Sequence, residues 1–177
     1  MKNKKRIIIG IDPSISHTGI AICDTSGEYI DSETINISRS RTHNQKLLII
    51  SAYIKHLVRS MIYSNRFPSC KIYKIICEQP FMGRNSSATA VLWEVVATIS
   101  QTFYKETGIE MEMISPIAAR SKLGISKNAS KDDIRRKIES LINKKNLTQD
   151  EIDATMIALS QIDNKGVNKR EAMRAAE

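Results

Sequence analysis

The sequence predicts an α/β fold in which a mixed five-stranded sheet is flanked by helices. Aliphatic runs of strand length alternate with long segments of helical periodicity, and three of the strand-like runs come first. The 177 residues are enough for one hydrophobic core, and 41% apolar with 26% charged residues is typical of a globular protein. We therefore expect one domain over residues 1–164, followed by a basic, polar and flexible tail over residues 165–177.

Five segments have the pattern of β-strands. Pro13 ends the first, a continuous aliphatic run typical of a strand buried on both faces. A turn cluster at residues 24–27 separates the second from the third, which predicts an antiparallel start to the sheet. Glu78 closes the fourth, and Pro116 follows the fifth. The segments are residues 6–12, 18–23, 28–37, 72–77 and 109–114.

Four segments have helical periodicity: residues 42–64, residues 86–107, residues 131–143 and a stretch beginning near residue 148. Gly108 is a natural C-cap for the second helix. Ser130 is a good N-cap for the third because an acid stands three residues later. Thr148 and Glu151 form the capping-box pattern at the start of the last helix.

The net charge of +8 and the pI of about 9.5 favour a polyanionic partner. Charge alone also fits an anionic membrane or RNA. No stretch approaches the length of a membrane span, and the N-terminal residues lead into a strand rather than a signal peptide. The three cysteines lack the spacing of zinc ligands and are interpreted as reduced thiols, so we expect the cytoplasm of a bacterium, or of a host if a phage encodes the chain.

Two carboxylates stand at the ends of predicted buried strands. Asp12 ends the first strand and Glu78 ends the fourth. A carboxylate in such a place costs free energy unless it is paired, hydrogen-bonded or bound to a metal. A turn-forming aspartate before Pro13 and a glutamate paired with a nearby lysine are the structural alternatives.

The last predicted helix carries three acids close to its start. At about 100° per residue, Asp150 and Asp153 point within about 60° of each other, whereas Glu151 points away from Asp153. The capping box gives Glu151 a structural role. The helix therefore offers a face with two carboxylates, Asp150 and Asp153.

Converging carboxylates repel one another unless a cation lies between them. Hard cations that prefer oxygen ligands meet this need, above all Mg²⁺, with Mn²⁺ as an alternative. Two such ions about 4 Å apart can activate water and stabilise the leaving oxygen of a phosphodiester. A basic protein with a carboxylate site for Mg²⁺ is typical of nucleases.

Three motifs in order resemble the RuvC-type Holliday-junction resolvases. They are Ile-Gly-Ile-Asp-Pro at residues 9–13 with Thr-Gly at residues 18–19, then Glu-Gln-Pro-Phe-Met at residues 78–82, then Asp-Glu-Ile-Asp-Ala at residues 150–154. The resemblance runs over about residues 7–160. The sequence differs from the family pattern at Ser14, where glycine is common, and at Pro80, and the more basic segment 59–71 leaves room for broader branch selectivity.

The resemblance implies an RNase H-like fold, a homodimer and paired nicks across a four-way DNA junction. It implies that Asp12, Glu78, Asp150 and Asp153 are the catalytic, metal-binding acids. Lys131 matches the basic residue that the family uses near its site, with Lys122 as the second candidate. Phe81 matches an aromatic residue that stacks at the junction, with core packing as its alternative. The helix over residues 86–106 resembles the family's dimer-forming helix.

Cations close to the motifs are candidates for contacts with DNA phosphates. Arg84, Lys122 and Lys127 complete this set beside Lys131. His17 lies near Asp12 in the sequence and is either a phosphate contact or a plain turn histidine.

Alternatives to a resolvase come from three classes. One is a broader debranching or flap nuclease, or an RNase H-like enzyme that acts on RNA. Another is an actin-like ATP-binding domain, since the run Gly-Ile-Asp-Pro-Ser at residues 10–14 with Thr-Gly at residues 18–19 also resembles the phosphate-binding hairpin of that class. The third is an inactive binding module on the nuclease fold.

Overall fold

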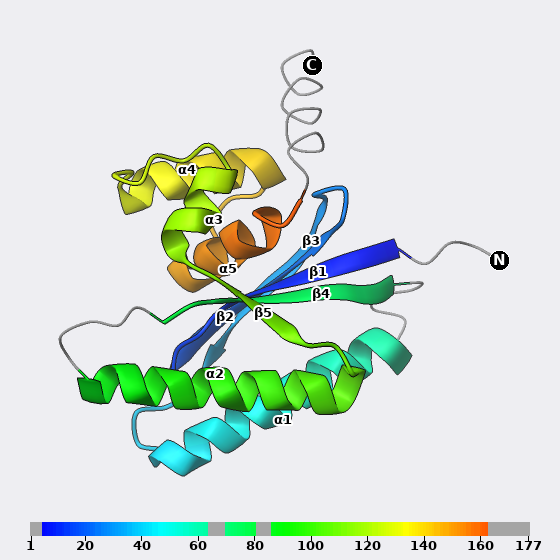
Figure 1. The fold of residues 1–177 in the computed structure, drawn as a ribbon, viewed down its shortest axis with the longest axis vertical. Coiled ribbons are helices and arrows are strands. Elements are labelled where there is room, and N and C mark those ends of the chain that lie inside the picture. Colours follow the sequence, from blue (N-terminus) through cyan, green and yellow to red (C-terminus); the bar gives the residue numbers. More distant parts are fainter. Residues whose placement is uncertain (1–4, 64–69, 81–85, 163–177) are drawn as a thin grey trace.

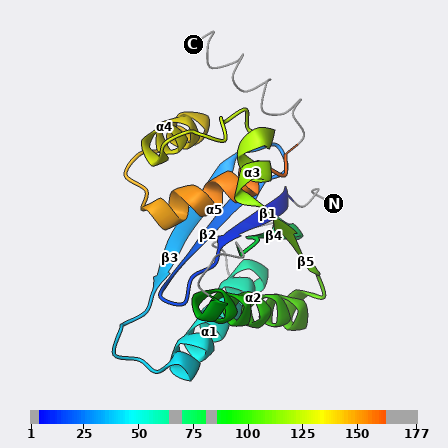
Figure 2. The same ribbon diagram turned by 60° about the vertical axis from the view of Figure 1, so that its left-hand side comes forward.

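The fold is a sheet covered by helices on both faces (Figure 1). The structure is a computed structural model that describes residues 5–63, 70–80 and 86–162. Helices α1 and α2 cover one face, and α3, α4 and α5 cover the other (Figures 1 and 2). The predicted α/β sandwich with a five-stranded mixed sheet is confirmed. The tail predicted over residues 165–177 lies outside the described residues.

The sheet has the strand order β3-β2-β1-β4-β5. Strand β1 pairs antiparallel with β2, which pairs antiparallel with β3, as the turn cluster predicted. On its other side β1 pairs parallel with β4, which pairs parallel with β5. The strands are β1 Lys5–Asp12, β2 His17–Asp24, β3 Tyr29–Asn36, β4 Cys70–Glu78 and β5 Met111–Ile114.

The helices begin and end close to the residues that the caps predicted. Their bounds are α1 His43–Tyr63, α2 Ser86–Thr107, α3 Pro116–Lys122, α4 Lys131–Ile142 and α5 Gln149–Leu159. Gly108 follows α2 with a φ of 71°, a conformation that glycine adopts without strain. Ser130 and Thr148 both form complete capping boxes, with Asp133 and Glu151 respectively.

Helix α3 is the element that the sequence did not predict. Pro116 follows the fifth predicted strand, but in the structure it is the first residue of a helix. Proline fits this position because its missing N–H would have no partner in the first turn. The side chain of Ser115 caps the helix by accepting a hydrogen bond from the amide of Ala118 at 3.2 Å. The fifth strand ends at Ile114 as predicted but begins at Met111 rather than at residue 109, and the fourth begins at Cys70.

Alternate residues of β1 belong to two different hydrophobic cores. Ile7, Ile9 and Ile11 are fully buried in the core beneath α1 and α2. Ile8 belongs to the core beneath α3, α4 and α5. Because side chains alternate along a strand, Gly10 and Asp12 face the same side as Ile8. The end of β1 therefore presents Asp12 toward the layer that contains α5.

Two of the three cysteines, Cys23 and Cys77, are buried, and Cys70 is half-buried. In the part of the chain that the structure describes, none of the helices is long and apolar enough to cross a membrane.

Candidate functional site

The ends of β1 and β4 bring Asp12 and Glu78 together. Ile11 pairs with Cys77 in the parallel register, so the next residue along each strand is an acid. Ile76 packs in the core beneath α5, and alternation places Glu78 on that same side. Both carboxylates thus stand at one edge of the sheet and face α5. The sequence prediction that strand ends position these two acids is confirmed.

Two glycines allow α5 to lie directly on the sheet backbone. A Cβ atom at Gly19 would stand 2.2 Å from the carbonyl oxygen of Asp150. A Cβ at Gly10 would stand 2.3 Å from the carbonyl oxygen of Ala154 and 2.5 Å from the amide nitrogen of Ala158. Gly19 is the register partner of Asp12 on β2. This contact therefore fixes the first turn of α5 beside Asp12.

The capping box occupies one of the three acids at the start of α5. The Oε2 of Glu151 accepts a hydrogen bond from the amide of Thr148 at 2.7 Å, and its Oε1 accepts from the hydroxyl of Ser32 at 3.2 Å. Glu151 thereby joins α5 to β3, as a structural residue. Of the three acids on this helix, Asp150 and Asp153 raise the pKa of Asp12.

Asp12 shows how strongly the acids act on one another. Burial, followed by the charges of Glu78, Asp153 and Asp150, raises the pKa of Asp12 from 3.8 to about 8, while Lys131 opposes the rise. The charges that raise it come from β4 and α5, which are far from β1 in the sequence. The structure thus brings all four predicted acids into one electrostatic group.

Glu78 and Asp153 are shifted in the same direction. Burial, with the charge of Asp153, raises the pKa of Glu78 from 4.5 to about 7. Burial also raises the pKa of Asp153, while a hydrogen bond from Gln149 and the charges of Lys131 and Arg120 lower it. A group of acids that disfavours its own negative charges in this way favours a cation.

Arg120 is a site residue that the sequence reasoning missed. It lies on α3, and its charge acts on both Glu78 and Asp153. Within the described residues its Nε is buried and has no hydrogen-bond partner. The cap at Ser115 and Pro116 could have predicted this helix and with it the position of Arg120. Lys131, the first residue of α4, is exposed and acts on Asp12 and Asp153, in line with its predicted place near the site.

The donor set fits a hard divalent cation. The four side chains offer only carboxylate oxygens, the ligands that Mg²⁺ and Mn²⁺ prefer. Among the described residues, no three histidine, cysteine or acidic side chains are already gathered as closely as metal ligands are. A cation bound by these acids would offset the repulsion that helps to raise the pKa values of Asp12, Glu78 and Asp153.

The predicted DNA contacts are only partly within the described residues. Lys122 at the end of α3 and Lys127 in the following loop are exposed. His17 is exposed at the start of β2, beyond the end of β1. Phe81 and Arg84 lie outside the described residues.

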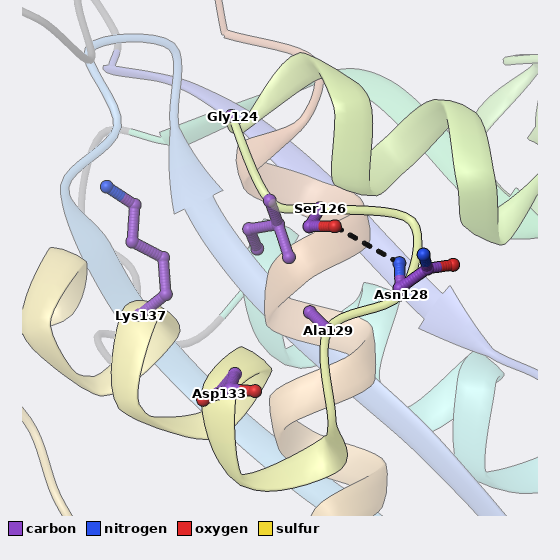
Figure 3. Close-up of a pocket in the computed structure, with 7 residues that line it drawn as sticks. Gly124, Ser126, Asn128, Ala129, Asp133 and Lys137 are labelled. Atoms are coloured by element: carbon purple, nitrogen blue, oxygen red, sulfur yellow. Dashed lines mark hydrogen bonds between the residues drawn. The ribbon is translucent and has the colours of Figure 1, made fainter.

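A separate pocket opens between the α3–α4 loop and α4 (Figure 3). It is lined by Gly124, Ile125, Ser126, Asn128, Ala129, Asp133 and Lys137. The hydroxyl of Ser126 accepts from the amide of Asn128 at 3.2 Å within the loop, and Asp133 is engaged in the capping box of α4. None of the four site acids lines this pocket.

Comparison with solved structures supports this architecture. Thermus thermophilus RuvC in complex with a Holliday junction substrate is 14% identical, with a TM-score of 0.70, over 88% of this chain and 91% of that chain. The yeast mitochondrial Holliday junction resolvase is 12% identical, with a TM-score of 0.57, over 96% of this chain and 82% of that chain. At these identities the likeness shows the fold, and the predicted RNase H-like fold is confirmed.

A search of curated proteins found no match. The model of the family described as crossover junction endodeoxyribonuclease RuvC matches residues 8–161, most of the chain. This match spans all four acids and both glycine contacts with α5. The chain belongs to the RuvC family of crossover junction endodeoxyribonucleases.

Proposed function

We propose that this endonuclease resolves four-way DNA junctions by paired nicks that depend on Mg²⁺, with Mn²⁺ as a substitute, and that leave a 5′-phosphate and a 3′-hydroxyl. Two ions in each site, a homodimer and the cytoplasm as the compartment are parts of the same proposal. The observation that carries it is the group of four acids. Asp12, Glu78, Asp150 and Asp153 come from three elements, and the charges of the other three raise the pKa of Asp12.

The residues around the site have separable tasks. Asp12, Glu78, Asp150 and Asp153 would hold the metal, which when bound lowers the pKa of water and neutralises charge on the phosphodiester. Arg120 and Lys131 offer positive charge beside the acids, where negative charge on the scissile phosphate would otherwise be repelled. Lys122 and Lys127 are exposed beyond them and are suited to hold backbone phosphates without reading sequence.

The outer face of α2 supports the homodimer. Trp93 and Tyr104 are 37% and 55% exposed, and their spacing of three helical turns places them on one side of the helix. Ala90 and Ala97 are also exposed and follow the same stripe. Exposed aromatic side chains with small neighbours are suited to a helix-to-helix contact between two copies.

Cleavage of a labelled four-way junction in Mg²⁺ and in EDTA tests the proposal, with linear duplex, flap and three-way DNA alongside. Paired symmetric nicks confined to the four-way junction and abolished by EDTA are expected. Equal cutting of flaps and three-way DNA would instead identify a broader debranching nuclease. Cutting that persists in EDTA would exclude the metal mechanism.

A matched pair of variants on α5 assigns the helix faces. Asp153→Asn is expected to fold and bind junctions but not cut them. Glu151→Gln keeps an acceptor for the Thr148 amide, so we expect full cutting and a loss of at most about 1 kcal/mol in stability. An inactive Glu151→Gln with an active Asp153→Asn would reverse the assignment.

A further inference from the structure

We propose that Gln149 is a positioning residue that holds the Asp153 carboxylate in the orientation needed for metal binding, and that Arg135 fixes the amide of Gln149 for this task. The inference rests on the proposed metal site and adds two residues of this chain to it.

The first observation is the contact between Gln149 and Asp153. Both lie on α5, and the Nε2 of Gln149 donates a hydrogen bond to Oδ2 of Asp153 at 3.0 Å. Gln149 is the first residue of the helix, so its side chain lies one turn before Asp153 on the same face. Because this bond fixes Oδ2, the carboxylate has a defined rotation about its last bond.

The second observation is the way in which Arg135 orients the amide. Its Nη2 donates to Oε1 of Gln149 at 3.2 Å. A guanidinium can only donate, so the carbonyl oxygen of the amide must face Arg135. The NH₂ group then faces Asp153, and the direction of the whole chain of bonds is determined.

Arg135 is itself held in place on α4. Its Nη1 donates to the carbonyl oxygen of Leu147 at 2.6 Å and lies 3.6 Å from Oε1 of Glu139. Its side chain is 30% exposed and that of Glu139 is 18% exposed, so both are largely shielded from water. A line of side chains thus runs from Glu139 through Arg135 and Gln149 to Asp153.

Gln149 and Arg135 would therefore orient a metal ligand, Asp153, without binding the metal themselves. Hydrogen bonds to ligating carboxylates set their orientation, and losing such a partner weakens metal binding by roughly 10-fold to 100-fold. Arginine suits the role because its planar fork can donate to Leu147 and to Gln149 at once. Lysine at this position would satisfy only one of the two acceptors in the same geometry.

The decisive variant is Gln149→Met, since methionine has a similar shape and helix propensity but neither donor nor acceptor. Binding of Mn²⁺ to the protein alone is measured by the loss of the free-ion electron paramagnetic resonance signal, with Asp153→Asn as the reference for a damaged site. Gln149→Met is expected to weaken Mn²⁺ binding about tenfold. Cleavage is expected to recover at high Mn²⁺, and junction binding in EDTA to match the wild type.

Gln161→Met is the matched control, because Gln161 lies beyond the other end of α5 and accepts from Lys74. It is expected to bind Mn²⁺ as the wild type does. Unchanged Mn²⁺ binding in Gln149→Met would overturn the positioning role while leaving the metal site in place. A wild-type protein that binds no Mn²⁺ would overturn the metal site as well.

A double-mutant cycle tests the part played by Arg135. Arg135→Met is expected to weaken Mn²⁺ binding in the wild type but to add no further loss to Gln149→Met, because it acts through that residue. Fully additive losses would overturn this route. If Arg135→Met does not fold, Arg135→Lys replaces it in the same cycle.

Discussion

Asp12 is the site acid whose negative charge most destabilises the metal-free protein. Its pKa lies near 8 in the folded protein and near 3.8 in an unfolded chain. Between these values the folded state binds a proton that the unfolded state does not bind, so stability falls as the pH rises through this window. Glu78, with a pKa raised to about 7, contributes in the same direction.

Asp12→Asn should therefore stabilise the protein while abolishing cutting. In EDTA at pH 8 we expect its free energy of unfolding to exceed that of the wild type by about 1–2 kcal/mol, with little difference near pH 4. Thermal unfolding across this pH range measures the effect, and Asp132→Asn on the exposed surface of α4 is the control. A wild-type protein equally stable at both ends of the range would show that the acids do not strain the fold.

Lys131→Ala tests whether a cation beside the acids serves the reaction or only the binding of DNA. Its charge acts on Asp12 and Asp153, so we expect cutting to slow about tenfold or more. Junction affinity in EDTA should change less than it does in Lys127→Ala, where only a phosphate contact is lost. Gel-shift titrations beside single-turnover cleavage separate the two effects, and the reverse ranking would make Lys131 a phosphate contact.

At the scale of single elements, the contact between α5 and the sheet decides where two of the acids stand. Gly19→Ala would place a Cβ atom against the backbone of Asp150, which cannot move without moving the first turn of α5. We expect a loss of about 1–3 kcal/mol in stability and a loss of cutting out of proportion to it.

Ile22→Val provides the stability-matched control for this change. Ile22 lies on the same strand but is buried in the core on the opposite face, so the variant should lose about 1 kcal/mol and keep cutting. Chemical denaturation and junction cleavage are measured on both variants. If Gly19→Ala cuts as well as Ile22→Val, the close contact at Gly19 does not position the acids.

The elements also show how far sequence reasoning extends. Strand ends and capping boxes are local signals, and they correctly placed Asp12 and Glu78 at the ends of two strands and Glu151 in the cap of α5. Helix α3 was not predicted, because Pro116 both follows a strand and begins a helix. With α3 unassigned, nothing local distinguished Arg120 from the other cations, since its closeness to Glu78 depends on packing between layers.

Gly10 and Gly19 are two more residues whose role depends on a contact between distant parts of the sequence. Both glycines belong to the first motif of the family resemblance, but the physical reason for them is contact with a helix that begins more than a hundred residues later. The Gln149–Arg135 contact is likewise invisible to periodicity, because it joins α4 to α5 through side chains.

At the scale of the whole molecule, paired nicks require two sites held at a fixed separation. Trp93→Glu combined with Tyr104→Glu should abolish dimer formation, since two charges would be introduced into the exposed stripe of α2. Light scattering after gel filtration measures the mass, and cleavage of a cruciform plasmid shows whether the two nicks remain linked.

Ile117→Glu is the control, because Ile117 is 63% exposed on α3, in the layer opposite α2. It should remain dimeric. A dimer that persists in the double variant would place the interface elsewhere on the molecule, whereas a monomer that still makes linked nicks would remove the need for a dimer.

The order of the elements along the chain also has a consequence for synthesis. Asp12 emerges from the ribosome with the first strand, but Asp150 and Asp153 emerge only with α5, the last of the described helices. A nascent or prematurely terminated chain that lacks α5 has two of the four acids and lacks the helix that packs against Gly10 and Gly19. The four acids can therefore come together only after α5 has been made, so we expect a chain truncated before Gln149 to be unable to cut junctions.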